Sequence, residues 1–139
     1  KFFQPIEDWI ASLMAENRVP TTEEIRNHLT VPLLDQINVD AGPTIYELSA
    51  GRLGISESPQ SVRQQSKRMG VTRARVYQLL EECSRVMEVR WPEGKHLLAQ
   101  LEAKLQAESE SQADLALLHA TRELFYPSKG KLSDEEAGA

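Results

Sequence analysis

The sequence predicts an all-α fold, and three observations support this prediction. Apolar residues recur at intervals of three and four along most of the 139-residue chain, which places them on one face of a helix. Strand-like alternation of apolar and polar residues never extends beyond about four positions. Residues that start and stop helices separate the apolar stripes. We therefore expect N-terminal helices, a central helix pair joined by a tight turn, and one or two C-terminal amphipathic helices.

The N-terminal helical segment, residues 1–43, opens with a helix that should end near Asn17. Pro5 suits the first turn of this helix. Thr21 and Glu24 have the spacing of a capping box and should start a second helix. The apolar stripe of the first helix is formed by Phe2, Phe3, Ile6, Trp9, Ile10, Leu13 and Met14.

The rest of this segment is predicted to be irregular. Ile25 and Leu29 continue the second helix, and residues 30–32 should break it, because Pro32 lacks a backbone N–H. We expect a short helical turn over residues 33–37 and a loop over residues 38–43.

The central segment, residues 44–92, contains the pattern that indicates a function. After a helix over residues 44–52, a second helix of about residues 59–69 ends at Gly70, which can adopt the left-handed conformation at little cost. Thr72 then stands where an N-cap belongs, and a longer helix should start near Arg73. This pattern predicts a helix-turn-helix.

The longer helix is predicted to have one apolar side, which faces the core, and polar residues at its N-terminal end. Its apolar stripe consists of Val76, Leu79, Leu80, Cys83, Val86 and Met87. Arg73, Arg75 and Gln78 fall off this stripe. Arginine fits the acceptor pair of guanine and glutamine fits the edge of adenine, so these residues are candidate base contacts. The alternative is that they are solvated surface residues.

Further candidates flank these positions. The helix preceding Gly70 carries Arg63, Lys67 and Arg68, and in this motif the first helix crosses the DNA backbone, so these residues are candidate phosphate contacts. Thr72 and Tyr77 complete the predicted DNA-binding set. For Tyr77 we keep two alternatives, namely contact with a thymine methyl or sugar, and packing against the C-terminal helices.

The run GVTRARVYQLLEECSRVM, residues 70–87, resembles the DNA-binding half of region 4 of bacterial sigma factors of the sigma-70 family. The resemblance covers roughly residues 44–92. It implies that the helix starting near Arg73 enters the major groove of double-stranded promoter DNA, and that RNA polymerase is a partner.

Three positions depart from that family. The family usually has an acidic residue at Ala74, a basic residue at Tyr77 and a buried aliphatic residue at Gln65. These departures leave a second hypothesis open, namely a protein-interaction module on a degenerate helix-turn-helix that binds RNA polymerase or another protein without reading DNA.

Charge is distributed unevenly along the chain. The formal net charge is −5, which taken alone argues against nucleic-acid binding. Residues 52–95 nevertheless hold nine Lys/Arg and five Asp/Glu, whereas both flanking segments are acidic. A local basic patch governs phosphate contact more than the net charge of the whole chain.

The C-terminal segment, residues 93–127, is predicted to form an amphipathic helix of about residues 93–108 and another that ends before Pro127. Three arrangements of this segment stay open, namely one long helix, a hairpin, or a pair that packs on the N-terminal half. Leu98, Leu101 and Leu105 resemble a short zipper seam, and burial within the chain competes with dimerisation as its explanation. Residues 128–139 should be a disordered tail.

Several classes of function have no support in the sequence. The lone Cys83 excludes a disulfide framework, and His28, His96 and His119 lie far apart, so we expect no metal site, no cofactor and no enzyme active site. No apolar run approaches the roughly 18 residues of a membrane span, and no signal peptide is evident. We expect a cytoplasmic protein without membrane contact.

Overall fold

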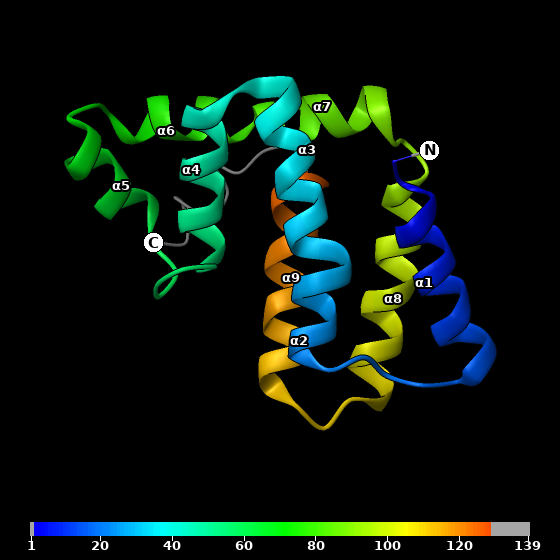
Figure 1. Cartoon of the computed structure of the whole chain (residues 1–139). Coiled ribbons are helices and arrows are strands. Elements are labelled where there is room, and N and C mark those ends of the chain that lie inside the picture. The colour runs from blue at the N-terminus through cyan, green and yellow to red at the C-terminus, as the bar shows by residue number, and fades with distance from the viewer. Residues whose placement is uncertain (1, 129–139) are drawn as a thin grey trace.

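The computed structural model describes residues 2–128, and all the regular secondary structure in that range is helical, which confirms the all-α prediction (Figure 1). The helices are α1 (Gln4–Glu16), α2 (Thr22–Ile25), the π-helix η1 (Arg26–Thr30), α3 (Val31–Ala41), α4 (Pro43–Leu53), α5 (Val62–Met69), α6 (Arg73–Leu80), α7 (Glu82–Arg90), α8 (Gly94–Glu108) and α9 (Gln112–Phe125). Residues 129–139, predicted to be a disordered tail, lie outside the described residues.

The first two helix boundaries follow the local signals. Asn17 takes the left-handed conformation with φ 53° and ends α1. The Thr21 hydroxyl accepts from the backbone N–H of Glu24, whose side chain accepts from the N–H of Thr21, so the predicted capping box is present. Both predictions are confirmed.

The predicted break at residues 30–32 is wrong. The helix continues from α2 through η1 into α3, and the loop expected over residues 38–43 shrinks to Gly42. The Val31 N–H bonds the carbonyl of Arg26, five residues back, so the helix widens immediately before Pro32. This π-turn lets the helix pass the missing N–H of proline, at a place where an α-turn would meet the steric clash of its ring.

The two C-terminal helices form a hairpin. Ser109–Ser111 turn the chain, and Ser111 caps α9 by accepting from the N–H of Asp114 at 3.2 Å. In Figure 1, α1, α8, α9 and the rod formed by α2, η1 and α3 stand side by side. In the same figure, α7 crosses one end of this bundle, and α6 lies beyond it beside α4 and α5. Of the three arrangements considered, one long helix is wrong. The two helices form the hairpin, and they also pack on the N-terminal half, as the third arrangement has it, through contacts of α8 with α1 and of α9 with α2.

Hydrogen bonds as well as apolar contacts join the hairpin to the rod. The hydroxyls of Thr30 and Thr121 lie 3.0 Å apart and are fully buried, and Thr22 bonds the carboxylate of Asp114. The buried apolar side chains of all three predicted segments belong to one cluster, which runs from Ile6 to Tyr126. The helices that present α5 and α6 are therefore fixed by a shared core.

Candidate nucleic-acid interface

Capping residues and a glycine close in sequence fix the ends of α5 and α6 at the corner between these two helices. Ser61 caps α5, with its hydroxyl 3.1 Å from the N–H of Gln64, so this helix begins three residues later than Pro59. Gly70 ends it with φ 72°, and the N–H groups of Gly70 and Val71 both bond the carbonyl of Ser66. The N–H of Arg75 donates to Thr72 Oγ1 at 3.1 Å, which fixes the start of α6.

The inner side of α6 anchors it to the core. Val76 and Leu80 are fully buried and Tyr77 is 6% exposed. Contacts with α4 and α5 hold the helix from below, and α7 continues it beyond Glu81, which keeps a right-handed helical conformation. The apolar stripe predicted for this helix is thus its packed side.

Five exposed cationic side chains lie on the two helices of the corner. Between Glu57 and Glu81 the chain contains no acidic residue. All five cations of that stretch are exposed, and we call them the cationic face: Arg63, Lys67 and Arg68 on α5, and Arg73 and Arg75 on α6. In Figure 1, α5 and α6 project at the end of the molecule away from α1 and α8, so those two helices do not cover them.

The leading end of α6 brings the candidate base contacts together. Arg73, Arg75 and Gln78 are exposed. Arg75 Nη1 lies 3.4 Å from Gln78 Oε1, so the two side chains share one turn of the helix surface and are partly ordered by each other. Thr72 is also exposed, but its hydroxyl already serves as the N-cap acceptor.

Tyr77 does not belong to this set. Its side chain lies in the hydrophobic core, so it cannot present its ring to a base or sugar from the outer side of α6. It follows Val76 on the packed side of α6, which contacts α4 and α5. The structure therefore removes Tyr77 from the predicted contacts. It places the side chain in a core where α6 packs chiefly on α4, α5 and α7 rather than on the C-terminal helices.

Arg85 lies just beyond the cationic face, on α7. Its guanidinium pairs with Glu82 and lies 3.6 Å from a carboxylate oxygen of Glu81. The positive charge of α7 is thus offset locally, and the face without acidic residues ends at Leu80.

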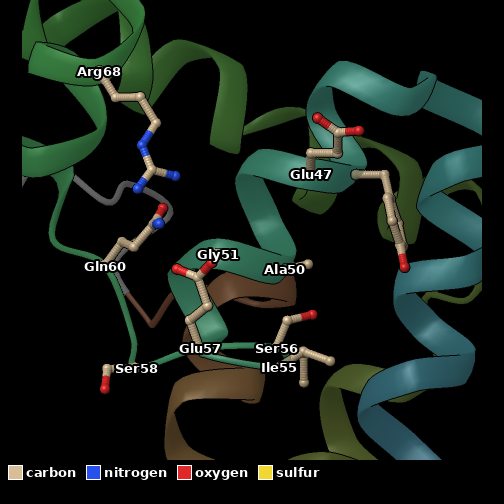
Figure 2. A pocket seen from close by; sticks show the side chains of 10 residues that line it. Glu47, Ala50, Gly51, Ile55, Ser56, Glu57, Ser58, Gln60 and Arg68 are labelled. Carbon is tan, nitrogen blue, oxygen red and sulfur yellow. The ribbon is translucent and has the colours of Figure 1, made fainter.

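A shallow hollow of about 220 Å³ lies between α4, α5 and the linker that joins them (Figure 2). Figure 2 shows the Arg68 side chain running back along α5 toward Gln60, with Glu47 and Glu57 on other sides of the hollow. Its lining consists of Tyr46, Glu47, Ala50, Gly51, Ile55, Ser56, Glu57, Ser58, Gln60 and Arg68.

Two residues at this hollow were not among the predicted contacts. Gln65, in the slot that the resemblance assigns to an aliphatic residue, is 2% exposed, and its Nε2 donates to the carbonyl of Leu48 at 2.9 Å. Gly51 lies in the interior of α4 directly against the side chains of Gln60 and Gln65. A glycine within a helical pattern was the available signal, since it often marks a close approach.

Across residues 2–128, no group of three or more His, Cys, Asp or Glu side chains is arranged to hold a metal ion. In the same range, no helix combines the length and the apolar character needed to cross a membrane.

Comparison of the chain with protein-family models, curated proteins and solved structures finds no match.

Proposed function

We propose that this protein is a DNA-binding transcription module of the sigma region 4 type, and that it inserts the leading end of α6 into the major groove. The observation that carries the proposal is the cationic face, with five exposed cations and no acidic residue over residues 58–80. A basic patch on one end of an otherwise acidic domain is the electrostatic footprint expected of a nucleic-acid-binding protein.

In the proposed docking, α6 contacts the bases and α5 contacts the phosphates. Arg73, Arg75 and Gln78 reach base edges from α6, where arginine pairs with guanine and glutamine with adenine. Arg63, Lys67 and Arg68 contact phosphates from α5, which crosses the backbone. Thr72 holds the start of α6 and offers its backbone to the nearest phosphate.

Binding to a fluorescently labelled duplex, measured by anisotropy over a range of salt concentrations, tests the proposal. Affinity should fall steeply as salt rises, because each neutralised phosphate releases counterions. Arg73→Ala should cost about 1–3 kcal/mol of binding free energy if the arginine pairs with a base. Arg85→Ala is the matched control, since this exposed arginine is already paired with carboxylates and should change binding little.

Two results would contradict this function. One is binding that does not depend on salt, and the other is an Arg73→Ala variant that binds as tightly as the parent while Arg85→Ala binds equally well. Association with core RNA polymerase is implied by the resemblance, and a binding assay with purified polymerase in the absence of DNA tests it separately.

A protein-interaction module is the second candidate, and a specific surface favours it. Val39 and Val89 are 77% and 80% exposed, and each precedes one member of the Asp40–Arg90 ion pair that joins α3 to α7. Exposed apolar side chains beside charged groups suit a protein partner. If substitution of both valines by serine abolishes polymerase binding and leaves DNA binding unchanged, the two functions occupy different surfaces.

A further inference from the structure

The contacts between α4, α5 and the linker contain two departures from ordinary local preferences. Gly51 occupies the interior of α4, where glycine weakens a helix, and Gln65 places an amide among buried residues. Such departures are expected at functional or strained positions. Both meet at the side chain of Gln60.

Glycine at position 51 leaves room for the side-chain amides of Gln60 and Gln65, which approach the helix backbone closely. A Cβ at this position would lie 2.6 Å from Gln60 Oε1 and 3.3 Å from Gln65 Nε2. The Gln60 backbone is held as well, since its N–H donates to the carbonyl of Gly51 at 2.9 Å and its carbonyl accepts from Arg52 Nη1 at 3.3 Å. The Gln60 amide is therefore presented from a fixed base.

That amide has two competing partners. With its oxygen toward Gln65, Gln60 Oε1 accepts from Gln65 Nε2 at 3.2 Å. With the amide reversed, its oxygen accepts from Arg68 Nη1 at 2.8 Å and from Nη2 at 3.2 Å, and its NH2 group faces Gln65 Nε2. In the first orientation the Gln60 NH2 group faces the Arg68 guanidinium, and in the second it faces Gln65 Nε2. One amide oxygen therefore cannot accept hydrogen bonds from Gln65 and Arg68 together.

Gln65 cannot turn to relieve this conflict. Its Nε2 is fixed by the hydrogen bond to the carbonyl of Leu48, and its Oε1 is buried without a hydrogen-bond partner. Reversing this amide would place its oxygen against the Leu48 carbonyl. The conflict is removed when the Arg68 guanidinium leaves Gln60 and finds another acceptor.

We infer that Gln65 is a positioning residue for Arg68 and acts through Gln60: Gln65 offers Gln60 a second partner, which allows Gln60 to release the Arg68 guanidinium to a DNA phosphate. This inference rests on the proposed function, because the phosphate is the acceptor that Arg68 moves to. It also gives a role to Gln65, the departure from the usual aliphatic residue at this position.

Matched glutamine-to-methionine substitutions test the inference, because methionine keeps the side-chain length and removes the amide. Gln65→Met leaves Gln60 bound to Arg68 alone, so affinity for a labelled random-sequence duplex at fixed low salt should fall about three- to tenfold, the value of one hydrogen bond. Gln60→Met releases Arg68 and should not weaken binding. Gln100→Met, at an exposed position on α8, is the control and should bind like the parent.

The Arg68→Ala background separates positioning from a general structural effect. There, Gln65→Met should cause no further loss of affinity. An equal loss in both backgrounds, or no loss in either, overturns the inference. Denaturant unfolding checks the fold, and Gln65→Met should unfold at the same or a higher denaturant concentration, since it removes the unpartnered buried oxygen.

A measurement without DNA distinguishes failure of this inference from failure of the proposed function. The NMR signal of the Arg68 side-chain Nε–H group should report a more rigid guanidinium in Gln65→Met and a more mobile one in Gln60→Met than in the parent. If these changes appear and no variant binds DNA, the amide exchange stands and the proposed function fails. If the Arg68 signal is the same in all three proteins, the exchange is overturned whatever the DNA result.

Discussion

Trp91 Nε1 donates a hydrogen bond to Glu7 Oε2 at 2.8 Å, which ties the end of α7 to the first helix of the chain. The indole also stacks on Phe3, with ring centroids 5.1 Å apart and planes 3° from parallel. Tyr126 meets the same indole edge-on and donates its hydroxyl proton to the Trp91 carbonyl. One side chain thus joins the start, the middle and the end of the described chain.

Replacing Trp91 should therefore cost more stability than any surface change. Trp91→Ala should lower the free energy of unfolding by about 3–5 kcal/mol, through lost burial and the cavity left behind. Guanidinium chloride unfolding measures this loss. Val89→Ala, two residues earlier and 80% exposed, is the control and should stay within about 0.5 kcal/mol of the parent. Equal stability of the two variants would show that Trp91 does not join these helices.

The turn between α5 and α6 should need glycine only because of its backbone conformation, and not because space for a side chain is lacking. A Cβ at Gly70 would meet no atom within 4 Å, so a substitution there is opposed only by the left-handed conformation at φ 72°. Gly70→Ala should cost about 1–2 kcal/mol of unfolding free energy, and Gly70→Asn should cost less, because asparagine tolerates this conformation. Thermal or denaturant unfolding of both variants checks the order, and a more costly asparagine would contradict it.

Cys83 should be unreactive in the folded protein. Burial raises the pKa of its thiol to about 12, and its sulfur lies 3.0 Å from the Ser49 hydroxyl. Because the thiolate is the reactive form, a thiol reagent at neutral pH should modify Cys83 only as fast as the protein opens. Fast stoichiometric labelling of the native protein would contradict its burial.

The same thiol should make stability fall at alkaline pH. Its pKa is higher in the folded state than its usual 9.0, so its contribution is complete below about pH 9 and is lost as the pH rises toward 12. Burial raises the pKa of Tyr126 as well, which adds to the same trend. Denaturant midpoints measured between pH 8 and pH 11 should decline, and Cys83→Ala should make the decline shallower.

The leucines of α8 should act within one chain. Leu98, Leu101 and Leu105 are each 0% exposed, and α8 packs on α1 and α9, so no seam remains for a second copy. Leu101→Ala should destabilise the protein by about 2–5 kcal/mol without changing its oligomeric state. Unfolding and sedimentation of the same variant measure both quantities, and dissociation of a dimer on this substitution would support the zipper alternative.

Much of the helical framework could be predicted from the sequence, because helix ends are decided by nearby residues. Thr21 with Glu24, Gly70 and Thr72 act within three or four positions of themselves, and each ends or starts a helix as expected. The apolar stripe around Val76 and Leu80 likewise marks the buried side of its helix. The candidate contacts at Arg73, Arg75 and Gln78 lie on the opposite, exposed side, as their spacing from this stripe indicates.

Other features were decided only by the tertiary structure, because they depend on residues distant in sequence. The helix passes Pro32 through a π-turn while Thr30 packs against Thr121, and a hairpin rather than a single long helix follows Glu108 because α8 and α9 bury each other's apolar sides. Tyr77 joined the core and Gln65 found the Leu48 carbonyl for the same reason. Local signals set where each helix begins and ends, whereas long-range packing chose which polar and aromatic side chains face inward.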